Sequence, residues 1–210
     1  MDIRGLRRSY ELGDLPEPDV EDPLVLFERW LGEARAVDHP GWEPSAMTLA
    51  TATPDGLPSA RTVLLKEFGA DGLVWYTNYN SRKGAELAAN PKAALLFYWA
   101  PLERQVRVEG SVEVLDPARS DAYFATRPAD SRIAAIASPQ SRVIPSRTHL
   151  EEAFAAATAE HIPPERPGNW GGFLLAPQVW EFWQGRRSRL HDRIRFRRDG
   201  DAWVRERLAP

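Results

Sequence analysis

The sequence of 210 residues contains no cysteine, which excludes disulfide bonds, cysteine-ligated zinc and thiol chemistry. This absence fits a reducing compartment, so the cytoplasm is the expected location. No apolar run approaches the roughly 20 residues that a membrane-spanning helix needs. The charged N-terminus also lacks the apolar segment of a signal peptide. We therefore expect neither membrane insertion nor export.

Several motifs of well-known protein classes are missing as well. The sequence has no His-Glu-x-x-His metal motif, no Walker-type phosphate loop, no dinucleotide-binding fingerprint and no nucleophile elbow. His39, His149 and His161 stand apart from other chemically informative residues. The net charge is -3, so the chain lacks the overall basic excess typical of nucleic-acid-binding proteins. We expect no metal site and no nucleic-acid partner.

The composition is that of a globular protein, with 43% hydrophobic and 27% charged residues. A chain of this length buries roughly 70% of the surface that it exposes when unfolded, so one hydrophobic core is sufficient. Residues 1–21 are charged and contain Pro16 and Pro18, which predicts a mobile N-terminal arm. Residues 22–210 are expected to form a single domain.

Hydrophobic spacing and turn signals predict a mainly β fold with flanking helices. Asp22 followed by Pro23 predicts a helix start, and apolar residues recur at helical spacing to about Arg35. A hairpin is expected from residues 46–53 and 58–67. Further strands are expected at residues 73–77, 92–99, 104–115, 172–175, 179–184, 193–197 and 202–208, and further helices at 81–90, 117–127, 128–137 and 148–160.

One strand-forming run begins at Arg61 and ends at Lys66. Its centre, Val63, Leu64 and Leu65, fits a largely buried strand. A buried strand carries charged ends only where each cation has a partner. Either an anion lies across this strand, or its terminal side chains reach solvent. A regular strand would also point the two cations to opposite faces, so either a bulge intervenes or they serve different ligands.

A second cationic cluster opens the helix predicted at residues 81–90. Ser81 is a suitable N-cap, and Arg82 and Lys83 follow in the first turn. Cations at this end oppose the helix dipole unless an anion binds both the free backbone donors and the side chains. The cluster is therefore either a phosphate site or an exposed basic turn.

The densest cluster of charges lies between Arg186 and Arg198, where seven arginines occur. If the segment from Arg189 to Arg193 is extended, its two ends and His191 share one face. Three nitrogen-rich side chains would then converge. A basic run is also typical of a solvated surface or a non-specific nucleic-acid patch.

Taken in order along the chain, these motifs resemble the pyridoxamine 5'-phosphate oxidase family. The resemblance covers nearly the whole sequence and rests on residues 61–66, Tyr76-Thr77, Ser81-Arg82-Lys83, Arg104-Gln105-Val106, Tyr123-Phe124, Arg127-Pro128, Ser131, Gln140-Ser141, 181–185, 189–193 and the closing Arg207-Leu208-Ala209-Pro210. It implies an FMN-binding split β-barrel, and a homodimer that holds FMN at the subunit interface.

The resemblance also implies which residues bind the two ligands. FMN would contact Arg61, Thr62, Val63, Leu64, Leu65, Lys66, Tyr76, Thr77, Arg82, Lys83, Gln105, Gln140, Ser141, Trp183 and Arg193. The substrate would contact Arg7, Tyr10, Lys66, Tyr123, Arg127, Ser131, Arg189 and His191. Within that second set, Arg7 and Tyr10 would act as a lid, and Arg189 and His191 are the candidate catalytic residues.

The implied reaction oxidises pyridoxamine 5'-phosphate or pyridoxine 5'-phosphate to pyridoxal 5'-phosphate, with dioxygen as electron acceptor. It releases hydrogen peroxide, and also ammonia from the amine substrate. Two alternatives are a split-barrel flavin oxidase of the phenazine-biosynthesis type and a non-enzymatic flavin- or nucleic-acid-binding module. The chain departs from the family pattern after Ser131, where Arg132 to Ile136 replace the expected Gln-Ile-Gly-Ala-Trp. The preference between the amine and the alcohol substrate is therefore open.

Overall fold

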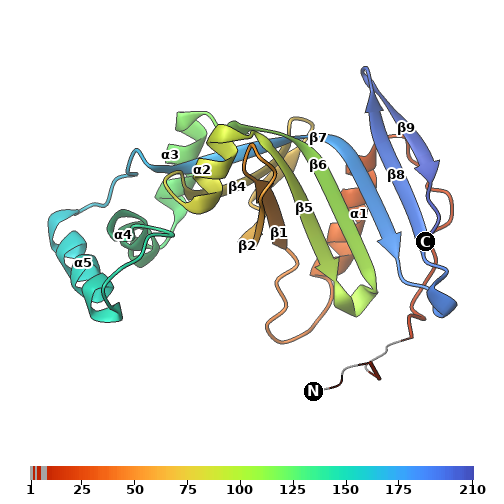
Figure 1. The fold of residues 1–210 in the computed structure, drawn as a ribbon, viewed down its shortest axis with the longest axis horizontal. Coiled ribbons are helices and arrows are strands. Elements are labelled where there is room, and N and C mark those ends of the chain that lie inside the picture. Colours follow the sequence, from red (N-terminus) through yellow and green to blue (C-terminus); the bar gives the residue numbers. More distant parts are fainter. Residues whose placement is uncertain (1, 3, 6–8) are drawn as a thin grey trace.

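The computed structural model describes residues 2, 4–5 and 9–210 (Figure 1). Within these residues, nine strands form one curled sheet in the order β2-β1-β5-β6-β7-β4-β3, with β8 paired to β7 and β9 paired to β8. The strands are β1 (Ala46–Ala52), β2 (Pro58–Leu64), β3 (Glu67–Gly69), β4 (Gly72–Asn78), β5 (Lys92–Trp99), β6 (Arg104–Val114), β7 (Trp170–Gln184), β8 (Asp192–Asp199) and β9 (Ala202–Arg207). The mainly β prediction is confirmed.

Five α-helices flank the sheet in the described part of the chain: α1 (Pro23–Arg35), α2 (Arg82–Ala89), α3 (Pro117–Thr126), α4 (Ala129–Ala137) and α5 (Arg147–Glu160). Two short 3-10 turns, η1 (Ala100–Leu102) and η2 (Arg187–Arg189), complete the set. Helices α4 and α5 pack on each other beyond one end of the sheet (Figure 1). None of the described helices is long and apolar enough to cross a membrane.

Helix α1 supplies one side of the main core. Asp22 caps its N-terminus by accepting a hydrogen bond from the backbone N–H of Leu24, as its sequence predicts. The buried face of the helix presents Phe27, whose ring centroid lies 5.2 Å from those of Phe97 on β5 and Trp180 on β7. Burial of aromatic side chains of this size dominates the stability of such a core.

The longest strand, β7, replaces two strands that the sequence analysis expected. Pro177 lies between the two expected strands, and the observed strand continues through it. Gly110 of β6 pairs with Pro177 and Glu109 pairs with Val179, so Gln178 is an extra residue in a bulge. A bulge tolerates proline because the regular ladder is already interrupted there.

The hairpin of β1 and β2 is confirmed, but β2 is not the buried core strand that was predicted. Among the described strands it pairs with β1 alone, so it lies at the edge of the sheet, and it is half exposed. The strand ends at Leu64, after which the backbone N–H of Lys66 donates to the carbonyl of Val74. Because the strand has ended before Lys66, the side chains of Arg61 and Lys66 no longer have to alternate across the sheet. Both can therefore face one cavity without a bulge.

The N-terminal segment contributes to the core, although residues 1–21 were predicted as an arm outside it. Leu15 is buried within the main hydrophobic cluster. Its backbone N–H donates to Asp192, and its carbonyl accepts from Arg207. Nearer the N-terminus, the carboxylate of Glu103 accepts hydrogen bonds from the backbone N–H groups of Glu11 and Leu12. The mobility of the arm stays a prediction, and Arg7 lies outside the described residues.

Candidate functional site

A cavity of about 490 Å³ lies where β2, β4 and β7 meet helices α2, α3 and α4. Most of its lining was predicted from the sequence. The lining residues are Arg61, Thr62, Val63, Leu64, Lys66, Tyr76, Thr77, Lys83, Tyr123, Arg127, Pro128, Ser131, Gln140 and Trp170. A smaller neighbouring cavity shares Arg127, Ser131, Gln140 and Trp170 with it. The fold therefore brings predicted cofactor and substrate residues together.

Lys83 is the buried cation of this cavity. Ser81 caps α2, as predicted, and places Lys83 in the first turn. The ammonium group donates to the hydroxyl oxygens of Thr77 and Ser81 at 3.0 and 3.3 Å and to the side-chain oxygen of Gln140 at 2.8 Å. Burial, and then the charge of Arg61, lower the pKa of Lys83 to about 8. Because its partners in the described residues are all neutral, this cation suits an anionic ligand.

Arg61 reaches the same cavity but already has an anionic partner. Its guanidinium donates to the hydroxyl of Thr51 at 2.6 Å and lies 3.4 Å from the carboxylate of Glu86. Arg82 pairs with the same carboxylate at 2.8 Å and does not line the cavity. The anion expected across the strand is therefore supplied by the chain itself. Sequence analysis missed Glu86, although its position four residues after Arg82 is a usable signal.

Three nearly parallel aromatic rings form one wall of the cavity. The rings of Tyr76 and Tyr123 stack with centroids 3.9 Å apart and planes 14° apart, and Trp170 lies 5.6 Å from Tyr76. The hydroxyl of Tyr76 donates to Glu67. Burial and this hydrogen bond raise the pKa of Tyr76. Tyr76 therefore supports Tyr123 through its ring.

Arg127 lies over the aromatic wall at the end of α3. Its guanidinium carbon is 4.6 Å from the centroid of Trp170, which is cation–π geometry. One terminal nitrogen, Nη1, is buried without a hydrogen-bond partner in the described part of the protein. Burial lowers the pKa of Arg127. A buried guanidinium nitrogen without an acceptor is costly, so this position also favours an anionic ligand.

The residues that depart from the family pattern, Arg132 to Ile136, lie on α4. Ser131 lines the cavity, whereas Arg132 does not. A terminal nitrogen of Arg132 donates to the carbonyl of Pro164 at 3.4 Å.

Two of the residues predicted to bind the flavin do not line the cavity. Leu65 is buried and Ser141 is exposed.

A second cluster lies at the other end of β7. Tyr98, Gln105, Trp183 and Arg193 are register partners on β5, β6, β7 and β8, so they form one row on one face of the sheet. Arg193 donates to the buried carboxylate of Glu181 at 2.9 Å and to the carbonyl of Ala209 at 2.8 Å. Glu181 opens the motif at residues 181–185, but it was not predicted as a site residue.

The N-terminal arm joins this second cluster. The ring of Tyr10 lies edge-on to Trp183 and to His191, with centroids 5.5 and 5.7 Å apart. Gly185 leaves the space that the arm occupies, because a Cβ atom there would lie 2.7 Å from Cγ of Tyr10. The arm therefore brings one predicted substrate residue next to another.

The segment from Arg189 to Arg193 is not extended throughout, so the condition for Arg189, His191 and Arg193 to share one strand face is not met. Ser188 and Arg189 have positive φ values of 58° and 61° in η2, and β8 begins only at Asp192. His191 is held by the backbone N–H of Arg186, which donates to Nδ1 across 3.0 Å. Burial, and then the charge of Arg189, lower the pKa of His191. Because Nδ1 accepts a hydrogen bond, neutral His191 carries its proton on Nε2.

The two clusters are far apart within one chain. Trp170 in the cavity and Trp183 in the second cluster lie near opposite ends of the 15-residue strand β7. At about 3.3 Å per residue, roughly 40 Å of strand separates them. One chain therefore does not bring Lys83 and Arg127 to His191.

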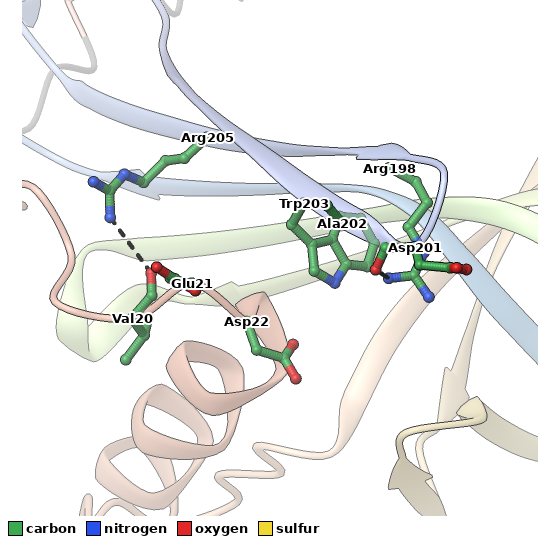
Figure 2. A pocket seen from close by; sticks show the side chains of 8 residues that line it. All are labelled: Val20, Glu21, Asp22, Arg198, Asp201, Ala202, Trp203 and Arg205. Atoms are coloured by element: carbon green, nitrogen blue, oxygen red, sulfur yellow. Dashed lines mark hydrogen bonds between the residues drawn. The ribbon is translucent and has the colours of Figure 1, made fainter.

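A larger hollow, of about 650 Å³, lies between the start of α1 and the β8–β9 hairpin (Figure 2). Its arginines are bound to the chain's own carbonyls: Arg198 donates to Asp201 at 3.2 Å and Arg205 to Val20 at 3.4 Å. Carboxylates also line it, including Asp22. The mixed charge and the occupied donors do not favour one class of ligand.

Comparison with known proteins supports the resemblance found in the sequence. Residues 36–160 match the family model described as pyridoxamine 5'-phosphate oxidase, and residues 170–210 match that of the pyridoxine 5'-phosphate oxidase C-terminal dimerisation region. A pyridoxine/pyridoxamine 5'-phosphate oxidase from Acidovorax sp. (strain JS42) is 56% identical over 99% of this chain and 96% of its own length. The protein of the same name from Thermosynechococcus vestitus is 54% identical over 99% of this chain and 99% of its own length.

Solved structures give the same fold. PhzG from Burkholderia lata 383, in complex with tetrahydrophenazine-1-carboxylic acid, superposes with a TM-score of 0.87 at 32% identity, covering 95% of this chain and 100% of that one. A pyridoxamine 5'-phosphate oxidase-related FMN-binding protein from Nostoc punctiforme superposes with a TM-score of 0.71 at 20% identity. The match covers 89% of this chain and 96% of that one. The split-barrel prediction is confirmed, and this chain belongs to the pyridoxamine 5'-phosphate oxidase family.

Proposed function

We propose that this protein is an FMN-dependent oxidase that converts pyridoxamine 5'-phosphate or pyridoxine 5'-phosphate into pyridoxal 5'-phosphate, for vitamin B6 synthesis and salvage. The observation that carries the proposal is one cavity with two cations, the buried Lys83 and the half-buried Arg127, that lack carboxylate partners among the described residues. Two phosphorylated ligands, FMN and the substrate, need two such cations. Relatives of that name at 53–56% identity support the assignment.

The residues around Lys83 fit the phosphate of FMN. The ammonium group is held by Thr77, Ser81 and Gln140, and the free N–H groups at the start of α2 lie beside it. Arg61 adds a second cation to the same cavity. FMN, when bound, accepts hydride at its N5 atom from the C4' carbon of the substrate and is reoxidised by dioxygen.

The residues around Arg127 fit the phosphate of the substrate. The guanidinium presents a buried nitrogen without an acceptor, and Lys66, Tyr123 and Ser131 line the same space. The stacked wall of Tyr76 and Tyr123 limits where a planar pyridine ring can lie. These residues bind and orient the substrate, which is the main task that the protein has in a cofactor-driven oxidation.

His191 and Arg189 complete the site from a second chain. Neutral His191 offers the N–H of Nε2 as a hydrogen-bond donor, because Nδ1 already accepts from Arg186. Arg189 adds a charge for the substrate. Since roughly 40 Å of strand separates this cluster from the cavity, we infer a homodimer in which each site takes Lys83 from one chain and His191 from the other. The match of residues 170–210 to a dimerisation region supports this inference.

Mixing two defective variants tests the shared site. Lys83→Met disables the cavity and His191→Ala disables the second cluster, so each homodimer has low activity. After the chains are mixed and allowed to exchange, each heterodimer contains one site with both native halves. Random pairing should then restore roughly a quarter of the wild-type activity. Failure to gain activity, with exchange verified by differently tagged chains, would contradict a site shared between subunits.

The reaction itself is tested without oxygen. Anaerobic addition of pyridoxamine 5'-phosphate to the flavin-loaded protein should bleach the flavin absorbance near 450 nm. One equivalent of pyridoxal 5'-phosphate should form in this anaerobic step, and readmitted oxygen should restore the absorbance and yield hydrogen peroxide. Flavin that stays oxidised would overturn the proposal and favour a non-enzymatic flavin-binding module.

The phenazine-type alternative is tested with the same assay. The structural match to PhzG at 32% identity gives it weight. The presence of Tyr123, Arg127 and Ser131 in the cavity favours a phosphorylated substrate instead. Reduction of the flavin by a reduced phenazine such as tetrahydrophenazine-1-carboxylic acid, but not by pyridoxamine 5'-phosphate, would reverse the assignment. The cytoplasmic location stays a prediction from the absence of cysteine.

A further inference from the structure

Glu86 is a buried carboxylate beside the proposed flavin site, with only 5% of its surface exposed. One carboxylate oxygen accepts from the hydroxyls of Thr51 and Ser59, each at 2.5 Å. The guanidinium of Arg61 lies 3.4 Å from this same oxygen, and the other oxygen accepts from Nε of Arg82 at 2.8 Å. Burial alone would raise its pKa, but the hydrogen bonds from Ser59, Thr51 and Arg82 and the charge of Arg82 lower the pKa of Glu86 to about 2. It is therefore ionised at neutral pH.

Three cations crowd this region, and Glu86 touches only two of them. Arg61 is close enough to Lys83 to lower the pKa of the ammonium, and Arg82 lowers that of Arg61. Lys83 binds neutral oxygens and does not contact Glu86. The carboxylate thus offsets the repulsion between the arginines but leaves Lys83 free to meet an anion.

We propose that Glu86 is a positioning residue for the phosphate of FMN: it holds Arg61, which lines the cavity, and Arg82, which lies outside the lining but opens the same helix as Lys83, in the orientation that a phosphate requires. The inference rests on the proposed binding of FMN. Glu86 joins α2 to the edge of the β1–β2 hairpin through Thr51 and Ser59, so it also fixes the helix that carries Lys83. Arg61 is held to the same hairpin by the carbonyl of Leu49 at 3.1 Å.

A simple structural role and a simple charge effect predict different outcomes. If Glu86 only stabilised the fold, its loss would weaken every flavin equally. If it acted only through its charge, removing that charge would strengthen phosphate binding, because a nearby anion repels phosphate. A positioning role predicts that removal of the Glu86 carboxylate weakens the binding of FMN but leaves the binding of riboflavin, which lacks the phosphate, nearly unchanged.

The test measures FMN and riboflavin dissociation constants of flavin-free protein by quenching of flavin fluorescence. We expect Glu86→Gln to weaken FMN binding about tenfold and to change riboflavin binding less than about twofold. An amide offers one acceptor oxygen and turns donors toward Arg82 or Arg61, so one arginine is released. Glu151→Gln is the matched control, because it neutralises an exposed carboxylate paired with Arg147 at 2.8 Å.

A second variant separates the role from folding. In an Arg82→Gln background, one of the held cations is already gone, so Glu86→Gln should weaken FMN binding less than about threefold. If Glu86→Gln does not fold, as judged by thermal unfolding, Glu86→Asp keeps the charge but withdraws the carboxylate, and it should still weaken FMN more than riboflavin.

Several results would overturn the inference: equal losses for the two flavins, unchanged or tighter FMN binding, or the same loss in both backgrounds. Wild-type protein that binds neither flavin would instead refute the proposed function.

Discussion

The ammonium group of Lys83 donates a hydrogen bond to the side-chain oxygen of Gln140 across 2.8 Å, although 57 residues separate them in the chain. Thr77 also donates to this oxygen, at 3.1 Å, so Gln140 joins the loop after α4 to the start of α2. All three side chains line one cavity. The buried cation is therefore held in place before any phosphate binds.

This arrangement predicts that FMN binding depends on pH. The pKa of Lys83 is lowered to about 8 by burial and by Arg61. A bound phosphate favours the protonated amine and raises its pKa, so FMN affinity is full below pH 8 and falls as pH rises above it. The dissociation constant should increase by up to about tenfold per pH unit in that range. Fluorescence titrations from pH 7 to 10 check this. Lys83→Gln should bind weakly with a flat profile, and a flat wild-type profile would contradict the assignment.

Replacing Arg127 with alanine should weaken substrate binding. The variant loses a charge-assisted contact of about 1.5–3 kcal/mol, which corresponds to a 10- to 100-fold rise in the substrate KM. Arg127→Lys should be intermediate, since it keeps the charge but not the planar stacking on Trp170. Arg147→Ala, which removes an exposed arginine, is the control. A KM that is unchanged in Arg127→Ala would count against a phosphate contact.

The arm is predicted to loosen when Gly185 is replaced with alanine. The added Cβ atom would lie 2.7 Å from Cγ of Tyr10, which is closer than such atoms approach. Tyr10 must then leave its contacts with Trp183 and His191. Chymotrypsin should cleave after Tyr10 several-fold faster in this variant. Gly168→Ala is the matched control, because nothing lies near the added atom there. Equal cleavage rates would show that Tyr10 does not need this space.

His191 should titrate below the ordinary histidine value of 6.5. Burial, followed by the charge of Arg189, lowers its pKa. The folded state therefore binds fewer protons at this ring, and the stability that it contributes is present above pH 6.5 and is lost as pH falls below it. NMR of the imidazole Cε1–H signal, assigned through His191→Gln, measures the pKa. Arg189→Gln should raise it toward 6.5, and a wild-type value above 6.5 would refute the prediction.

Local features of the chain were predictable from the sequence alone. Asp22 and Ser81 cap α1 and α2 as expected, because N-caps depend on contacts only two or three residues away. Alternating apolar residues identified the β-rich fold, and the order of short motifs identified the family. The cationic cluster that begins at Ser81 was also recognised from its unfavourable placement in a first turn.

Only the tertiary structure decided which charges have partners. The family resemblance predicts contact with FMN for both Arg61 and Lys83. Among the residues that the structure describes, Arg61 is paired with Glu86, whereas Lys83 contacts only neutral oxygens. Likewise, the edge position of β2 depends on how the sheet is ordered. The positive φ of Arg189 and the separation of the two clusters along β7 depend on the path of the folded chain. Local sequence determines propensity, whereas distances between remote residues follow from packing and strand register.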